Sequence, residues 1–183
     1  MEIEWSSSKT LNDVINYNPD TGKATWKKRD TIYFRGNDRT CRTWNSNFSG
    51  NPCLNSIHKD GYLKGMVNSK MLLSHRVFWA MCHDEWPEQI DHINGIRDDN
   101  RLCNLRAAND YENSRNRKLP QNNTSGVVGV YFQKSSGKWK SQILTREKTV
   151  YLGLFLDFND AVLSRIEAEK KYGYHKNHGR IKP

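Results

Sequence analysis

The sequence has no long apolar run and few cysteines, and each shortage excludes a class of protein. Its longest uninterrupted apolar run, from Val77 to Cys82, is far too short to cross a bilayer. The first residues, MEIEWSSSKT, lack the basic and then apolar pattern of a secretory signal. The four cysteines are widely spaced without a Cys-x-x-Cys pair, which argues against a zinc knuckle and a disulfide framework. We therefore expect a soluble, intracellular protein with no membrane partner.

Apolar residues are scarce as well. They make up 36% of the 183 residues, and the mean hydropathy is −0.89. These values are low for one large core, so we expect two modest cores joined by polar connections. Six Trp, eight Tyr and six Phe nevertheless argue against wholesale disorder, because disordered chains are usually poor in aromatic residues.

Acidic residues are outnumbered. Lys and Arg exceed Asp and Glu by 29 to 20, which gives a formal net charge of +9. Residues 101–148 contain many of the basic residues, namely Arg101, Arg106, Arg115, Arg117, Lys118, Lys134, Lys138, Lys140, Arg146 and Lys148. Clustered positive charge is typical of nucleic-acid-binding surfaces, although a merely soluble basic face would have the same composition.

A polar segment divides the chain. The residues KLPQNNTS, at 118–125, combine proline, paired asparagines and small side chains, which favours a turn or linker. We therefore expect a first domain at 1–118, a linker at 119–125, and a second domain at 126–183 that ends in a C-terminal tail.

Turn signals in the first domain predict short hairpins. The segment YNPDTGKATW, at 17–26, predicts two strands around a Pro-Asp-Thr-Gly turn, and HKDGYLKGMV, at 58–67, predicts a hairpin with Asp-Gly at its turn. Apolar spacing at 72–82 predicts a short helix. His75 in this helix is either a second active-site histidine or a structural residue on the packing face. Residues 30–60 carry no clear pattern.

The next segment, 90–117, reads IDHINGIRDDNRLCNLRAANDYENSRNR and predicts a strand, a loop, a second strand and a helix. The strands are expected at 89–93 and 104–107, with an Asn-Gly turn after the first. Asn109 followed by Glu112 forms a capping-box pattern, so a helix should begin directly after Asn109.

The residue types in this segment suit one divalent cation bound against a phosphate. Mg²⁺ prefers oxygen ligands and takes one or two protein groups plus waters and phosphate oxygens. Asp91 offers a carboxylate, and Asn113 offers an amide oxygen from the predicted helix. His92 can take a proton from water, although it points away from the Asp91 side of the strand unless the strand end twists. Asn104 is suited to hold the loop by bonding backbone groups.

The last fifty residues predict three strands and a helix. Strands are expected at 127–132, 138–144 and 149–154, followed by a helix with Asp157 or Asn159 at its N-terminal cap. A three-stranded sheet backed by one helix is compact enough for this length.

Basic and aromatic residues alternate along these strands, and such a sheet face can lie in a DNA major groove. Trp139 has an alternative role as a core aromatic. The residues expected to contact DNA are Arg106, Arg115, Arg117, Lys134, Lys138, Trp139, Lys140, Arg146, Lys148 and Tyr151.

The segment at 90–117 resembles the HNH nucleases, in particular the phage and intron-encoded homing endonucleases with a ββα-metal (His-Me finger) core. The resemblance implies that Asp91 and Asn113 bind one Mg²⁺ or Mn²⁺ ion, that His92 is the general base, and that Asn104 is the structural asparagine of the catalytic motif.

Other parts of the first domain extend or limit this likeness. Asn100 matches a position where asparagine is usual, and we interpret it as structural. The segments LLSHRVFWA and YNPDTGKATW are also similar to this branch, so the likeness covers most of 11–117. Two features differ from the wider family: Asn113 stands where many members have histidine, and the zinc-binding cysteine pairs of some relatives are absent.

The segment after residue 125 resembles the DNA-binding domain of plant ethylene-response factors, which is also found fused to HNH homing nucleases. The matching framework comprises Gly129-Val130, Gly137-Lys138-Trp139, Leu152-Gly153, Phe155 and Ala161. The base-reading arginines of the plant domain are replaced by Val128, Tyr131 and Leu144. The resemblance thus implies DNA binding without the plant target sequence.

Together these features predict an α+β fold, with an N-terminal ββα-metal nuclease domain followed by a small three-stranded antiparallel sheet packed on one helix. The predicted activity is hydrolysis of phosphodiester bonds in double-stranded DNA, in the cytoplasm of a bacterial host infected by phage. The alternative is a catalytically inactive, sequence-specific DNA-binding regulator. No aromatic pair of the kind that stacks RNA bases is visible, which disfavours RNA. The target sequence, the choice between a nick and a double-strand break, and the choice between monomer and homodimer stay open.

Overall fold

The computed structural model describes residues 3–109, 113, 116, 119–176 and 178–179. The molecule divides into two compact units, Met1–Ala108 and Asn109–Pro183. This division lies before the linker that the sequence predicts, and the role of each unit stays a prediction. Helices and several small antiparallel sheets are combined, which confirms a mixed α/β fold.

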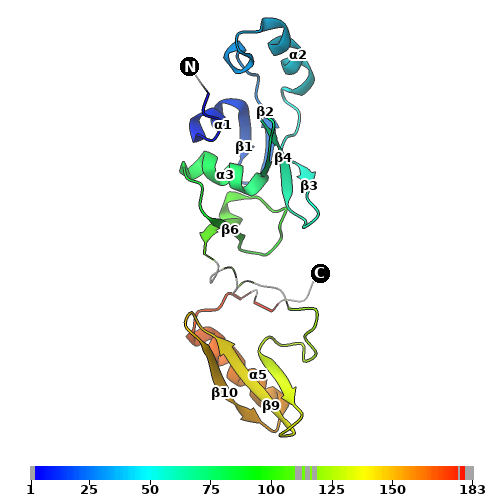
Figure 1. Ribbon diagram of the computed structural model, residues 1–183, viewed down its shortest axis with the longest axis vertical. Coiled ribbons are helices and arrows are strands. Elements are labelled where there is room, and N and C mark those ends of the chain that lie inside the picture. Colours follow the sequence, from blue (N-terminus) through cyan, green and yellow to red (C-terminus); the bar gives the residue numbers. More distant parts are fainter. Residues whose placement is uncertain (1–2, 110–112, 114–115, 117–118, 177, 180–183) are drawn as a thin grey trace. The chain divides into compact units, whose positions relative to one another are not determined.

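The first unit is built from three short hairpin sheets and three helices (Figure 1). Its elements are α1 (Ser8–Val14), β1 (Ile15–Asn18), β2 (Lys23–Trp26), the 3-10 helix η1 (Thr31–Phe34), α2 (Asp38–Phe48), β3 (Ser56–Ile57), β4 (Leu63–Val67), β5 (Lys70–Leu73), α3 (Ser74–His83), β6 (Gln89–His92), the 3-10 helix η2 (Leu102–Asn104) and β7 (Leu105–Ala108). Pairing of β1 with β2, and of β3 with β4, confirms the two hairpins predicted from their turns.

The predicted helix at 72–82 starts later than expected, at Ser74. A further hairpin, β4–β5, takes Leu72 and Leu73 into a strand. Its two-residue loop, Asn68-Ser69, has φ of 46° and 61°, the left-handed backbone that tight hairpin turns require. The turn therefore overrides the helical spacing at the start of the predicted helix.

The region without a clear sequence pattern packs beside Arg29, a half-buried cation. The guanidinium of Arg29 lies 5.5, 4.6 and 3.8 Å from the ring centroids of Trp5, Trp26 and Trp44. Burial lowers the pKa of Arg29 to about 10. Asn37 accepts a hydrogen bond from the backbone N–H of Thr40 and so caps α2. Contacts of Trp44 with Trp26, Phe34 and Phe48 pack this part of the unit.

Helix α3 connects the core of the first unit to the β6–β7 hairpin. One side of the helix joins the main core, where Phe78 is 1% exposed and stacks on Tyr17 at 4.2 Å. Trp79 packs with Ile90 of β6 and Leu105 of β7 in a second, smaller cluster. The hairpin is thereby anchored to the rest of the unit.

In the second unit, the strands β8 (Val130–Gln133), β9 (Lys138–Leu144) and β10 (Thr149–Phe155) form an antiparallel sheet in the order β10-β9-β8. Helix α5 (Phe158–Lys171) packs on one face of this sheet (Figure 1). These elements confirm the predicted sheet and helix, although the first strand begins at Val130 rather than Val127.

Two features fix the helix against the sheet. Asp157 caps α5 by accepting hydrogen bonds from the N–H groups of its first turn. Arg165 is 2% exposed and donates from Nη1 to the carbonyl of Gln142 at 2.6 Å, so the helix is bonded to β9.

No helix in the described part of the chain has both the length and the apolar content that a transmembrane span requires.

Candidate functional site

Strand β6 carries Asp91 and His92 as neighbours on opposite sides of its backbone. Burial alternates along the strand: Ile90 and His92 are 7% and 4% exposed, and Asp91 is intermediate. Side chains of adjacent strand residues point to opposite faces, so His92 faces the interior of the unit beside α3. Asp91 faces Arg106, its direct cross-strand partner on β7.

Asp91 forms an ion pair across the hairpin. Its Oδ2 accepts hydrogen bonds from Nε and Nη2 of Arg106 at 3.1 and 2.7 Å. The side chain of Asp91 is 11% exposed and that of Arg106 is 35% exposed. The sequence predicts that Arg106 contacts DNA. In the structure its guanidinium pairs with the Asp91 carboxylate, and the DNA contact stays a prediction.

The donor chemistry of Asp91 fits a hard divalent cation, because carboxylate oxygen is the ligand that Mg²⁺ prefers. No cluster of three or more His, Cys, Asp or Glu side chains with metal-binding geometry occurs among the described residues. A cation at Asp91 would therefore be completed by an amide oxygen, water or phosphate.

The other predicted ligand, Asn113, belongs to the second unit. Its N–H donates to the carbonyl of Asn109 at 2.9 Å, a helix-type contact. Glu112, Arg115 and Arg117 lie outside the described residues, so the helix of the predicted ββα arrangement and the roles of these residues stay predictions.

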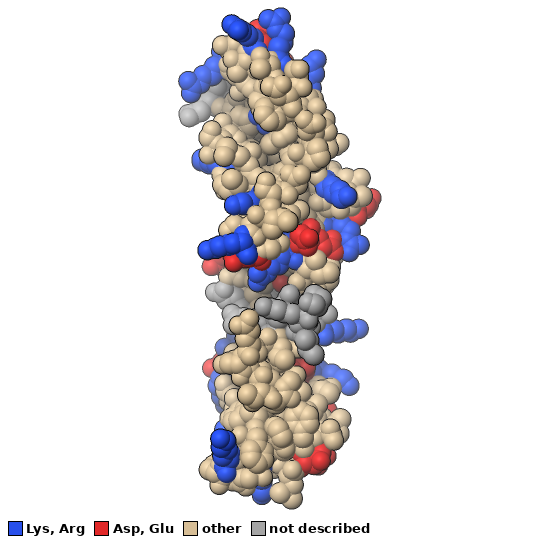
Figure 2. Space-filling model, turned by 90° about the vertical axis from the view of Figure 1, so that its right-hand side faces the viewer, with Lys and Arg blue, Asp and Glu red and all other residues tan. Residues whose placement is uncertain are grey.

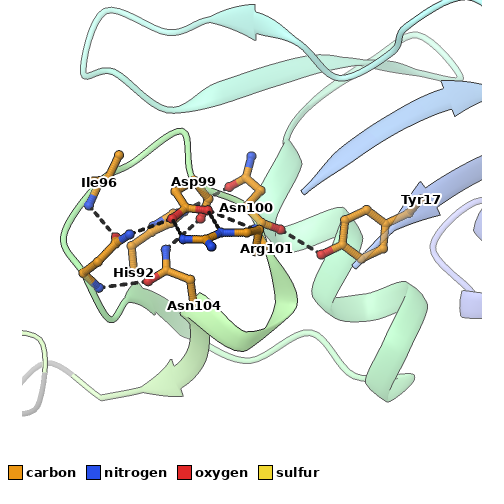
Figure 3. Close-up of polar contacts among 8 residues, drawn as sticks. Tyr17, His92, Ile96, Asp99, Asn100, Arg101 and Asn104 are labelled. Atoms are coloured by element: carbon orange, nitrogen blue, oxygen red, sulfur yellow. Dashed lines mark hydrogen bonds and ion pairs between the residues drawn. The ribbon is translucent and has the colours of Figure 1, made fainter. Parts of the chain in front are cut away.

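His92 is held by Asn100. Asn100 belongs to the loop that connects β6 with η2. The Nε2 atom of His92 lies 3.0 Å from Oδ1 of Asn100 (Figure 3). Burial lowers the pKa of His92, while the bond to Asn100 acts in the opposite direction. The lowered pKa favours a neutral imidazole at pH 7, which is the form that can accept a proton.

His75 lies beside this histidine. Its ring centroid is 5.0 Å from that of His92 and 5.1 Å from that of Tyr62. Burial lowers the pKa of His75 to about 3, and the protonated form of His92 and the charge of Arg76 act in the same direction. Within the described part of the chain, Nδ1 of His75 is buried without a hydrogen-bond partner. The structure therefore brings His75 to the site as a neutral, packed imidazole.

Asn104 bonds both ends of the loop. Its Oδ1 accepts from the N–H of Asn94 at 2.9 Å, and its Nδ2 donates to the carbonyl of Asp99 at 2.7 Å (Figure 3). These contacts brace the loop that contains Asn100. A catalytic contribution of Asn104 stays a prediction.

Asp99 and Arg101 stiffen the same loop. Nε and Nη2 of Arg101 donate to the Asp99 carboxylate at 2.8 and 2.6 Å. These bonds, more than any other contact, hold the pKa of Asp99 at about 2.

Acidic and basic side chains are interspersed on the lower part of the first unit in Figure 2.

Sequence reasoning missed two residues that the fold brings to the histidines. The ring of Tyr62 lies 5.7 Å from that of His92, and the guanidinium of Arg97 lies 4.9 Å from Tyr62. Arg97 also donates to the carbonyl of Asp60 at 2.6 Å, which ties the loop to the β3–β4 turn. No local pattern marks these contacts, because they join segments that are far apart in sequence.

In the second unit, the sheet face opposite α5 presents Lys140 between two tyrosines. Its Nζ lies 5.7 Å from the ring of Tyr131 and 5.8 Å from that of Tyr151. Lys138 lies on the same face because side chains alternate along β9. Trp139 lies on the other face, with its ring 4.6 Å from that of Phe158 on α5, so it packs on the helix side.

Three further predicted DNA contacts of this unit lie in turns. Lys134 is in the exposed turn between β8 and β9, and Arg146 and Lys148 are in the exposed turn between β9 and β10.

Comparison with known proteins agrees with part of this picture. An HNH endonuclease family model matches residues 73–115, a range that contains α3, β6 and β7 and does not reach the sheet of the second unit. Protein 3.8 of Escherichia phage T7 is 36% identical over 76 residues, which cover 40% of this chain and 63% of that protein. No solved structure matches the chain. The segment that holds Asp91 and His92 is therefore similar to HNH endonucleases.

Proposed function

We propose that the protein is a metal-dependent DNA endonuclease of the HNH homing type. One observation carries the proposal: the HNH endonuclease match spans the hairpin on which Asp91 and His92 are adjacent. The bond from His92 to Asn100, and the pairing of Asp91 with Arg106, support it further. The substrate is double-stranded DNA, and the reaction is hydrolysis of a phosphodiester bond.

His92 acts as the general base. Its burial favours the neutral ring, and the unprotonated nitrogen takes a proton from the attacking water. Asp91 and Asn113 are the proposed protein ligands of one Mg²⁺ or Mn²⁺ ion. When bound, such an ion offsets the negative charge that develops on the phosphate and on the leaving oxygen.

The positions of Asp91 and His92 restrict where a phosphate can bind. Because the two side chains leave β6 on opposite sides, we propose that the phosphate binds beyond the end of the strand, beside the Asn94-Gly95 turn. Arg106 already pairs with Asp91 and supplies a positive charge at the hairpin. We propose that this charge helps to attract the phosphate.

The second unit is proposed to anchor the enzyme on duplex DNA, in the manner of the ethylene-response-factor domain that it resembles. The sheet face with Lys138, Lys140 and Tyr151 is the contact surface, and the two exposed turns add positive charge. A strand face of this width can enter the major groove. Trp139 supports that surface from the helix side.

We further propose that the enzyme acts in the cytoplasm of a phage-infected bacterium. The similarity of part of the chain to a phage protein supports this setting.

A cleavage assay on a pool of supercoiled plasmids with random inserts tests the proposal. We expect Mg²⁺ to convert part of the pool to open-circular or linear DNA, and EDTA to block the conversion. The ratio of the two products distinguishes nicking from double-strand cutting. DNA binding without any conversion would refute the nuclease and support the DNA-binding regulator.

A further inference from the structure

We propose that Asn100 is a positioning residue for His92, and that the β1–β2 hairpin is the element that holds Asn100 in place. The inference rests on the proposed function, because it assigns the group that orients the general base. Asn100 is 1% exposed, and its side chain meets the imidazole directly.

The contact between Asn100 and His92 selects one form of the ring. An amide oxygen only accepts hydrogen bonds, so the Oδ1 of Asn100 at 3.0 Å requires a proton on Nε2 of His92. In a neutral imidazole the lone pair then lies on Nδ1. Asn100 thereby sets which nitrogen can take a proton from water. Within the described residues, Nδ2 of Asn100 has no hydrogen-bond partner, so the oxygen makes the side chain's directed contact.

Three contacts from the β1–β2 hairpin fix the backbone around Asn100. The hydroxyl of Tyr17 donates to the Asn100 carbonyl at 2.7 Å (Figure 3), and the N–H of Leu102 donates to the carbonyl of Pro19 at 2.9 Å. Gly22 packs so closely that a Cβ there would lie 2.6 Å from the backbone of Asn100 and Arg101.

Tyr17 is itself held rigidly. Its ring stacks on Phe78 of α3 with centroids 4.2 Å apart and an angle of 11° between the planes. The same helix carries His75, whose ring lies 5.0 Å from that of His92. The base is therefore confined from two directions: by α3 on one side, and by the loop that the hairpin supports on the other. The hairpin itself lies outside the matched family segment, 73–115.

Two matched pairs of substitutions separate positioning from general stability. Asn100→Asp keeps an acceptor oxygen at the same place, whereas Asn100→Leu removes it. Tyr17→Phe removes one hydroxyl and keeps the stacked ring. Tyr33→Phe is its control, because the Tyr33 hydroxyl bonds the exposed Asp13 side chain and does not touch the loop.

Each full-length variant is measured in two ways. Single-site cleavage kinetics give kcat and KM for DNA. Long-range ¹H–¹⁵N NMR of the imidazole nitrogens reports the ring form of His92 whether or not the protein cuts DNA.

We expect wild-type His92 to carry its proton on Nε2. Asn100→Leu should mix the two ring forms and release the ring from its orientation, which should lower kcat by about 10-fold, less than the loss of the general base itself, with KM little changed. Asn100→Asp should restore most of kcat, Tyr17→Phe should lower kcat by several-fold, and Tyr33→Phe should behave as wild type. If Asn100→Leu does not fold, the other three variants carry the comparison.

A wild-type ring protonated on Nδ1 would overturn the proposal. Unchanged ring form and kcat in Asn100→Leu would also overturn it, as would equal losses in Tyr17→Phe and Tyr33→Phe. A protein that shows the expected ring forms but cuts no DNA would uphold the positioning contact and refute the nuclease.

Discussion

The buried imidazole of His75 predicts that the first unit loses stability in mild acid. Burial lowers the pKa of His75 to about 3 from an ordinary value near 6.5, so between these values the unfolded chain binds a proton that the folded chain does not. The free energy of unfolding is therefore unaffected by the titration of His75 above pH 6.5, and it falls progressively as the pH drops toward 3. His92 and Arg76, which face or flank this ring, add to the unfavourable charge.

The expected magnitude follows from the two pKa values. Each pH unit between them costs about 1.4 kcal/mol, so lowering the pH from 7 to 5 should cost about 2 kcal/mol at His75 alone. Other groups also titrate in this range. His75→Phe isolates the contribution, because it keeps a flat ring beside Tyr62 and His92 and removes the titrating group.

Urea unfolding followed by tryptophan fluorescence is the assay, since five of the six Trp residues lie in the first unit. The free energy of unfolding of the wild type and of His75→Phe is measured at pH 7, 6 and 5. The wild type should lose about 2 kcal/mol more than the variant over this range. An equal loss in both proteins would refute the assignment of a buried, neutral His75.

Three further predictions concern the base, the loop and the DNA-binding face. His92→Ala should abolish cleavage and leave DNA affinity within about twofold, and normal cutting would contradict the general-base role. Gly22→Ala should lower the free energy of unfolding by about 2 kcal/mol more than Gly36→Ala, as measured by urea unfolding. Both glycines have positive φ, 69° and 76°, but a Cβ would strike backbone only at Gly22, so equal losses would contradict the close packing. Joint replacement of Lys138 and Lys140 by Glu should weaken DNA binding, as measured by fluorescence anisotropy titration. The slope of log affinity against log salt concentration should fall by about 2. Unchanged affinity would show that this sheet face does not bind DNA.

Local sequence signals were enough for much of the fold. The Pro-Asp-Thr-Gly and Asp-Gly turns located two hairpins, and alternation with turn signals located β9 and β10 closely. Of the two predicted capping candidates, Asp157 and Asn159, the structure has Asp157 at the start of α5. These features depend on a few adjacent residues, which is why one sequence reveals them.

Features that depend on distant contacts were missed. Helix α2 was missed although Cys41, Trp44 and Phe48 recur at helical spacing, and its packing around Arg29 depends on aromatic rings from several segments. The left-handed Asn68-Ser69 turn displaced the start of α3. The first miss reflects tertiary packing. The second reflects a local turn whose left-handed backbone overrides the helical spacing.

The candidate site shows the same division. Residue types and the resemblance to HNH nucleases drew attention to Asp91 and His92, whereas the pairing of Asp91 with Arg106 came from the observed register of the hairpin. In contrast, the approach of His75 to His92 joins α3 to β6, and Tyr17 reaches Asn100 across most of the unit's sequence. Residue types identify candidates for chemistry, whereas their supporting contacts come from the fold.

The most direct test of the proposed nuclease compares Asp91→Asn with Asp98→Asn in Mg²⁺-dependent cleavage of the plasmid pool. Asp98 is an exposed carboxylate on the same loop, so it controls for the loss of one negative charge. We expect Asp91→Asn to abolish cleavage and Asp98→Asn to cut at a rate close to that of the wild type. Mg²⁺-dependent cutting at the wild-type rate by Asp91→Asn would refute the proposed role of Asp91 as a metal ligand.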